Sequence, residues 1–225
     1  MNKGIWAPLL FVGVAIFACG TSALAQSSSP AAGQGEVKAP TIPSRPGVWG
    51  DIVYGNENAP VELIEYGSLT CPACASFATE VVPRLMEDFI SKGQLKFVFR
   101  NFVRDRYDLA AASASRCIAN EDDAKAALDD LFKEQESWMK SSNPYQSMAE
   151  IVGRYGLSQE EMGQCISDQA VRLHIVEMRQ NGLEEHEVKA TPTLVLNGVP
   201  MLFPGYDRLK LRIETQIATQ SLSGN

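Results

Sequence analysis

Apolar residues follow two different spacings in the first half of the chain, and each spacing predicts one kind of element. The run VELIEY, residues 61–66, is rich in strand-forming residues and ends at Gly67-Ser68, which predicts a short strand. From Cys71 to Phe89, apolar residues recur every three or four positions, as on one face of a helix. In residues 94–103, large apolar residues alternate with others, which predicts a second core strand.

Two prolines and a glycine shape the predicted helix. Pro72 suits its first turn, because the N–H that proline lacks would have no partner inside the helix there. Pro83 lies within the apolar stripe and is expected to kink the helix about one turn earlier. Ser91-Lys92-Gly93 is typical of a helix end.

The second half of the chain begins with helical patterns and closes with a hairpin and a helix. Helical spacing continues from about Tyr107 to His186. The run KATPTLVLNGVPMLF, residues 189–203, then contains two short β runs joined at Asn197-Gly198, a dipeptide favoured in two-residue hairpins. Residues 206–218 are expected to form the closing helix. The predicted order is βαβ, a helical insert, then ββα.

The N-terminus has the pattern of an export signal. Residues 1–25 combine Lys3, an apolar run and the small residues ALA before Gln26, which predicts a cleaved signal peptide. An uncleaved membrane anchor and lipid attachment at Cys19 are the alternatives. Residues 26–47 are rich in Ser, Pro, Gly and Ala, and we expect them to form a flexible linker.

Charge and size narrow the classes of function. Cleavage after residue 25 removes Lys3 and leaves 19 Lys and Arg against 27 Asp and Glu, a net charge of −8, so nucleic acid is not an expected partner. No later apolar run is long enough to span a bilayer. A chain of this size can bury its core as one domain, with or without an insertion.

Four cysteines remain in the exported body: Cys71, Cys74, Cys117 and Cys165. An even number in an oxidising compartment favours disulfides. A four-cysteine zinc site normally needs two close pairs, but Cys117 and Cys165 are 48 residues apart, so metal binding is not expected. Ala75 stands where a c-type haem motif needs histidine.

The pair Cys71 and Cys74 opens the predicted helix. Unpaired N–H groups and the positive end of the helix dipole stabilise a thiolate there, so its pKa is expected to fall. We interpret Cys71 as the exposed attacking thiol and Cys74, on the apolar stripe, as the resolving thiol. The alternative is a structural disulfide, but so short a loop would restrict the unfolded chain little.

These features together resemble the DsbA-like branch of the thioredoxin superfamily. The resemblance rests on the CPAC motif between two strands, the long helical insert, and Thr-Pro before the hairpin. It implies an α/β thioredoxin fold with an inserted helical domain. Residues 48–105 and 188–225 would form the two parts of the thioredoxin-like domain, and residues 106–187 would form the insert.

The resemblance also assigns residues to the site. Pro192 corresponds to the family's cis-proline, and Thr191 before it would lie against the dithiol, where an extended substrate segment can add. An ordinary trans proline on an edge strand is the alternative. Glu65 corresponds to a buried acid beneath the dithiol that exchanges a proton with Cys74. Glu62, on the opposite face of the strand, is the competing candidate.

Cys117 and Cys165 are expected to form a second, structural disulfide, as in some family members. The alternative is two buried, unpaired cysteines. Ala73 departs from the best-known family motif, which has histidine there, and so offers the Cys71 thiolate no side-chain donor.

The implied function is a periplasmic thiol-disulfide oxidoreductase that donates the Cys71–Cys74 disulfide to reduced exported polypeptides. Thiol-disulfide exchange needs no metal or organic cofactor. The family implies reoxidation by a membrane partner resembling DsbB, and a monomer is expected because residues 26–47 are too short and polar for a dimerisation domain. The alternatives are a reductase or isomerase of the same fold and, from another class, a metal chaperone holding Cu(I) between Cys71 and Cys74.

Overall fold

A computed structural model describes residues 50–223. The predicted signal peptide, the predicted linker and Cys19 lie outside the described residues. Within residues 50–223, no helix is both long enough and apolar enough to cross a membrane.

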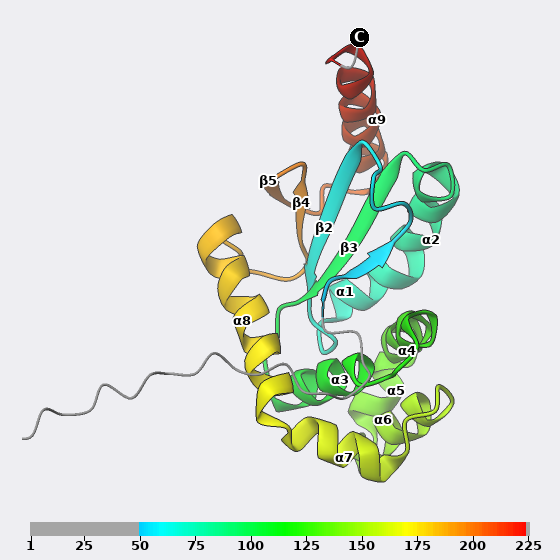
Figure 1. The fold of residues 1–225 in the computed structure, drawn as a ribbon, viewed down its shortest axis with the longest axis vertical. Coiled ribbons are helices and arrows are strands. Elements are labelled where there is room, and N and C mark those ends of the chain that lie inside the picture. Colours follow the sequence, from blue (N-terminus) through cyan, green and yellow to red (C-terminus); the bar gives the residue numbers. More distant parts are fainter. Residues whose placement is uncertain (1–49, 224–225) are drawn as a thin grey trace, which may run out of the picture. The chain divides into compact units, whose positions relative to one another are not determined.

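The centre of the fold is a five-stranded sheet with the order β1-β3-β2-β4-β5 (Figure 1). Its strands are β1 (Ile52–Tyr54), β2 (Val61–Gly67), β3 (Leu95–Asn101), β4 (Thr193–Leu196) and β5 (Val199–Leu202). Strands β2 and β3 are parallel, as expected for a βαβ unit, and the other neighbours are antiparallel. The thioredoxin fold predicted from the sequence is therefore confirmed.

Strand β1 was missing from the predicted order. It pairs with β3 over three positions only, from Ile52 opposite Phe99 to Tyr54 opposite Phe97. A three-residue run is too short for an alternation of apolar and polar residues to stand out. Its composition is still typical of a strand, since Ile52, Val53 and Tyr54 are all strand formers followed by a glycine.

The helix after β2 is interrupted where the sequence predicted a kink. It consists of α1 (Pro72–Ser76), a π-helical turn at Phe77–Val81, α2 (Val82–Leu85) and a second π-helical turn at Met86–Ile90. Pro83 lies in the first turn of α2, directly after the first π-helical turn. The wider turn relieves the clash that a proline ring makes with the preceding helical turn.

The predicted helical region between the two parts of the sheet is also confirmed. It contains α3 (Arg106–Arg116), α4 (Glu121–Lys133), α5 (Gln135–Lys140), α6 (Pro144–Gly153), α7 (Gln159–Ser167) and α8 (Gln169–His186). Helix α9 (Tyr206–Ser223) closes the chain and begins where the sequence predicted. The hairpin turns at Asn197 and Gly198, whose φ angles of 46° and 81° fit the two central positions of a type I′ turn.

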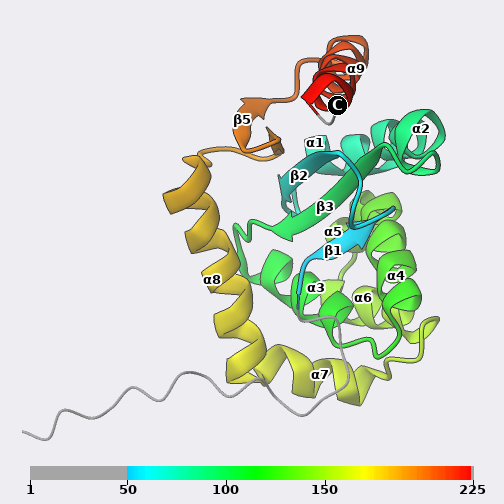
Figure 2. The same cartoon turned by 45° about the horizontal axis from the view of Figure 1, so that its top comes forward.

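The two faces of the sheet are covered by different helices. On one face, buried residues of β2 and β3 belong to a core shared with α1, α2 and α9, and this core continues into the insert (Figure 2). On the other face, Ile64, Tyr66 and Val98 pack with Leu183 of α8 and with Val188.

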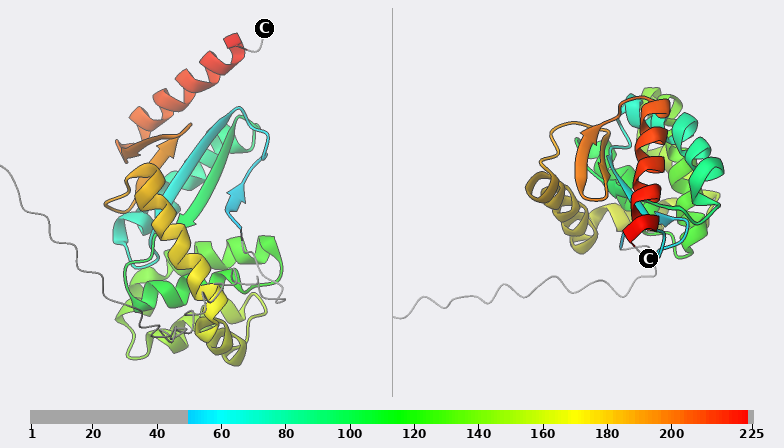
Figure 3. Two further views of the ribbon diagram at one scale, coloured as in Figure 1. Left: turned by 60° about the vertical axis from the view of Figure 1, so that its left-hand side comes forward. Right: turned by 90° about the horizontal axis from the view of Figure 1, so that it is seen from above.

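Helix α8 ends just before the boundary that the sequence placed after residue 187, but it contacts both the insert and the sheet. One end packs against α3 and α7, and the other end lies over β3 (Figure 3). Gly182 allows this close approach, because a β-carbon there would lie 2.7 Å from the Tyr66 ring. The last turns of α8 therefore cover one face of the sheet, while its first turns belong to the packing of the insert.

Candidate active site

The loop between β2 and α1 sets the position of the two cysteines. Cys71 is the N-cap residue of α1 in extended conformation, and Pro72 occupies the first helical position. The Cys71 N–H donates to the Ser68 carbonyl at 3.1 Å, and the Cys71 carbonyl accepts the N–H groups of Cys74 and Ala75. The first turn of the helix thus brings the two sulfur-bearing residues to the same end of α1.

Cys71 is not the exposed residue that the sequence suggested. Only 5% of its surface is accessible, and Cys74 is completely buried. The cause is the segment before β4, because the Cys71 thiol lies 3.4 Å from the Thr191 carbonyl, to which it donates. A sequence pattern cannot show this cover, since the two residues are 120 positions apart.

The surroundings of Cys71 favour its thiolate. The pKa of Cys71 is lowered from its ordinary value to about 5, first by the hydrogen bond with the Cys74 thiol. Burial opposes this effect, whereas hydrogen bonds from the Thr191 side chain and from the backbone of Cys74 and Ala73 add to it. The two cysteines are not joined in a disulfide in this structure. The geometry is that of a reactive dithiol at a helix N-terminus.

Cys74 has the opposite tendency. Its pKa is raised far above the usual range by the hydrogen bond to Cys71, by burial and by the charge of Glu65. One backbone contact acts the other way, because the Ser68 N–H donates to Cys74 Sγ at 3.5 Å. The pair therefore shares one proton unequally: Cys71 ionises readily and Cys74 retains its proton.

Of the two candidate acids, Glu65 is the one near the dithiol. Its side chain is 1% exposed, on the sheet face that packs against the cysteines. Burial and then the charge of Cys71 raise the pKa of Glu65 to about 8. Among residues 50–223, no hydrogen-bond partner faces Glu65 Oε1. Glu62 lies on the other face and forms an ion pair with Lys96.

Thr191 and Pro192 lie beside the redox pair. The peptide bond between them is cis. Pairing of β4 with β2 starts only at Thr193, opposite Tyr66, so Thr191 precedes the ladder. Its carbonyl is directed at Cys71 Sγ. The structure thus brings Cys71, Cys74, Glu65, Thr191 and Pro192 into one cluster.

Three polar side chains, from Asp105 just before the insert and from two residues within it, hold the loop and were not found from the sequence. Asp108 of α3 is fully buried and accepts the Ser68 hydroxyl at 2.5 Å and the Leu69 N–H at 2.8 Å. Asp105 caps α3 and accepts the Thr70 hydroxyl. Gln135 Nε2 donates to the carbonyls of residues 69 and 71. In the sequence, acids at 105 and 108 indicate only the start of a helix.

Burial shifts the ionisation of Asp108 as well. The pKa of Asp108 is raised to about 6, because burial outweighs the hydrogen bonds from Ser68, Leu69 and Arg104. The carboxyl therefore stays ionised near neutral pH and is held by neutral donors rather than by a cation.

Cys117 and Cys165 are joined in a disulfide, with their Cα atoms 6.3 Å apart. It links the residue that ends α3 to α7, so it belongs to the insert and not to the loop that carries the redox pair. It encloses a loop of 48 residues.

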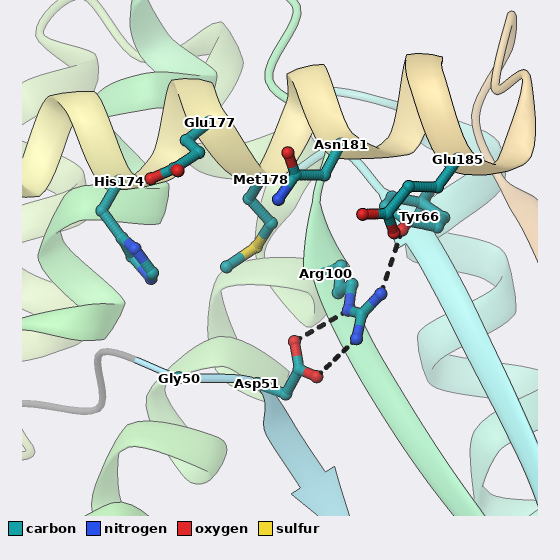
Figure 4. A pocket seen from close by; sticks show the side chains of 9 residues that line it. All are labelled: Gly50, Asp51, Tyr66, Arg100, His174, Glu177, Met178, Asn181 and Glu185. Atoms are coloured by element: carbon teal, nitrogen blue, oxygen red, sulfur yellow. Dashed lines mark hydrogen bonds and ion pairs between the residues drawn. The ribbon is translucent and has the colours of Figure 1, made fainter.

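A separate polar pocket of about 460 Å³ lies on the other face of the sheet, beside α8 (Figure 4). Arg100 donates to both Asp51 carboxylate oxygens and to the Tyr66 hydroxyl. His174 lines this pocket, and His186 Nδ1 lies 3.1 Å from the same hydroxyl. Both histidines are half-buried, because they lie on α8, which packs against the sheet.

In the part of the chain from Gly50 to Ser223, no three His, Cys, Asp or Glu side chains are grouped as a metal site.

Comparisons with known proteins agree with this geometry. Residues 48–214 match the family model described as thioredoxin. A Rickettsia bellii protein provisionally named as a protein-disulfide oxidoreductase is 28% identical over 150 residues, 66% of this chain and 58% of its own length. The chain spans between half and two thirds of the length of such rickettsial relatives.

A second relative covers more of both chains. Disulfide bond formation protein D of Bacillus subtilis is 27% identical over 180 residues, 78% of this chain and 81% of that protein. Among solved structures, α-DsbA1 of Wolbachia pipientis is similar with a TM-score of 0.71 and 25% identity, covering 78% of this chain and 95% of that one.

Proposed function

Because the chain belongs to the thioredoxin family and has the fold of its DsbA-like branch, we propose that it is an exported thiol-disulfide oxidoreductase that donates the Cys71–Cys74 disulfide to reduced polypeptides. The observation that carries the proposal is the position of Cys71. Its thiol lies at the N-terminus of α1, against the Thr191 carbonyl, with a pKa of about 5.

The first step is attack by a substrate thiolate on Cys71 Sγ of the oxidised pair. The new bond joins the substrate sulfur to Cys71, and the electron pair of the broken bond goes to Cys74 Sγ. Glu65, buried beside Cys74 and with a pKa of about 8, is suited to give that sulfur its proton.

The second step releases the oxidised product. Another thiolate of the substrate attacks its own sulfur in the mixed disulfide, and Cys71 leaves as a thiolate. The low pKa of Cys71 makes it a good leaving group in this step. Two electrons have then passed from the substrate to the pair, and the substrate has gained a disulfide.

The segment at Thr191 and Pro192 is the proposed substrate platform. Since Thr191 precedes the β4 ladder, and its carbonyl loses the Cys71 thiol donor when the disulfide forms, its backbone can pair with an extended segment whose cysteine faces Cys71. The signal-like N-terminus supports a place outside the cytoplasm, in the periplasm. There, a membrane partner resembling DsbB would restore the disulfide, and a monomer suffices for the chemistry.

A direct test measures recovery of a reduced, unfolded protein whose activity depends on disulfides. The oxidised protein is expected to restore that activity, and Cys71→Ala is expected to be inactive. The direction of electron flow is read separately, from cells quenched in acid and alkylated. A mostly oxidised pair supports disulfide donation, whereas a mostly reduced pair would contradict it and indicate a reductase or isomerase.

A further inference from the structure

The loop that precedes Cys71 carries polar groups that are shielded from water. Ser68 is completely buried and Thr70 is 6% exposed. Their hydroxyl groups, and the backbone of Leu69 between them, are bound by the side chains of Asp105, Asp108 and Gln135. Burying such groups without partners is unfavourable, so these contacts define one loop conformation.

Asp108 makes the contacts that fix Ser68. Its Oδ2 accepts the Ser68 hydroxyl at 2.5 Å and the Arg104 N–H at 2.9 Å, and its Oδ1 accepts the Leu69 N–H at 2.8 Å. A buried carboxylate that accepts three donors has little freedom to move. Ser68 is therefore held through its own side chain and through the next peptide unit.

The orientation of Ser68 matters because its N–H faces the buried sulfur of the redox pair. That N–H lies 3.5 Å from Cys74 Sγ. Burial and the neighbouring Glu65 carboxyl both work against negative charge on this sulfur, whereas an N–H donor directed at it works in favour.

We propose that Asp108 is a positioning residue of the exchange reaction: by holding Ser68, it keeps the Ser68 N–H in place to stabilise the charge that forms on Cys74 Sγ when the Cys71–Cys74 bond breaks. The inference rests on the proposed function and deepens it. Asp108 does not touch the reacting atoms; it acts through Ser68.

The bond changes set the kinetic signature. When a thiolate attacks Cys71 Sγ, the Cys71–Cys74 bond breaks and its electron pair moves to Cys74 Sγ. In the reverse step, the Cys74 thiolate attacks Cys71 Sγ and expels the other thiolate. Both directions pass through the same transition state, so loss of the N–H contact slows both by the same factor. The reduction potential then changes little.

The test uses reduced glutathione and the full oxidised protein. The rate constant for reduction is measured for wild type, Asp108→Asn and Ser68→Ala. Asp108→Asn keeps the volume but replaces one acceptor oxygen by a donor, and we expect it to slow the reaction about tenfold. Ser68→Ala removes the hydroxyl group with its contacts to Asp108 and Thr70 but leaves the Leu69 N–H contact to Asp108, and it is also expected to slow the reaction.

Asp88→Asn is the matched control, because Asp88 also joins two elements through hydrogen bonds, from Tyr206 and Lys210, but remote from the loop. It is expected to leave the rate constant unchanged. An equal rate constant for wild type and Asp108→Asn would overturn the proposal. If Asp108→Asn does not fold, Ser68→Ala decides: a wild-type rate constant refutes the proposal and a slower reaction supports it.

A second measurement distinguishes an effect on the charge at Cys74 from a general disturbance of the site. In the Cys74→Ala background, the reaction of the Cys71 thiolate with oxidised glutathione no longer involves charge on residue 74. Adding Asp108→Asn there is expected to change nothing, and a slowed reaction would overturn the proposal. If wild type itself fails to exchange with glutathione, the proposed function fails. If wild type exchanges and the Asp108 and Ser68 variants react with the same rate constant, only this inference fails.

Discussion

The pH dependence of the reduction potential follows from the protons taken up when the disulfide is reduced. Cys71 has a pKa of about 5 in the reduced protein, and the pKa of Cys74 is raised far above its usual range. Reduction by two electrons should therefore take up two protons below about pH 5 and one proton above it. The expected potential falls by about 59 mV per pH unit below this break and by about 30 mV per pH unit above it.

In the wild-type protein, Glu65 also takes up part of a proton when the disulfide is reduced. Its pKa of about 8 is raised first by burial and then by the Cys71 charge, which exists only after reduction. Reduction should thus raise the pKa of Glu65 and draw in an additional fraction of a proton. We expect the reduction potential of wild type to fall by more than about 30 mV per pH unit between pH 5 and 8. For Glu65→Gln, we expect the slope to change from about 59 to about 30 mV per pH unit near pH 5.

The same ionisation makes the stability of the reduced protein depend on pH. The pKa of Cys71 falls on folding from about 9 to about 5. The resulting stabilisation is complete above about pH 9, decreases as the pH falls, and is lost below about pH 5. At pH 7 the shift corresponds to at most about 3 kcal/mol, and we expect about 1–2 kcal/mol because solvent screens part of the interaction.

Two measurements check this reasoning. Equilibration against glutathione at a series of pH values gives the potential of wild type and Glu65→Gln. Chemical denaturation of the reduced and oxidised forms gives the difference in their free energies of unfolding. A single slope of about 59 mV per pH unit for Glu65→Gln from pH 4 to 8 would refute the low pKa of Cys71.

Three other predictions concern single features. Cys74→Ala should accumulate mixed disulfides with exported proteins, detected on non-reducing gels, and Cys71→Ala should not; equal trapping would reverse the assigned roles. Ala73→His should raise the reduction potential, measured against glutathione, by about 20–30 mV. A hydrogen bond from the histidine to the Cys71 thiolate would contribute about 1.5–3 kcal/mol if buried, and less at this exposed position. Replacing Cys117 and Cys165 by alanine should lower the free energy of unfolding in urea by up to about 4 kcal/mol, from the 48-residue loop, and leave glutathione exchange intact.

The order of elements was predictable because each long element has its own spacing of apolar residues. The change of period at Cys71 indicated a strand leading into a helix, and Asn197-Gly198 indicated the hairpin. A strand of three residues, Ile52–Tyr54, carries too few positions for any spacing to show.

What the sequence could not show depends on contacts between distant segments. The burial of Cys71 results from Thr191, and the loop is held by Asp108 and Gln135, which are separated from it by 39 residues or more. A polar residue on a predicted helix is usually assigned to solvent, and only the packing of α3 and α5 against the loop shows otherwise.

The contacts of Gln135 have a consequence for a chain that emerges from the ribosome residue by residue. Gln135 reaches the carbonyls of Leu69 and Cys71, which are made 66 and 64 residues earlier. Until α5 has been synthesised and has folded, the loop before the dithiol lacks the donor that completes it, although both cysteines are already present. A nascent chain therefore carries both thiols before their surroundings are complete, and Thr191, which contacts Cys71, is made later still.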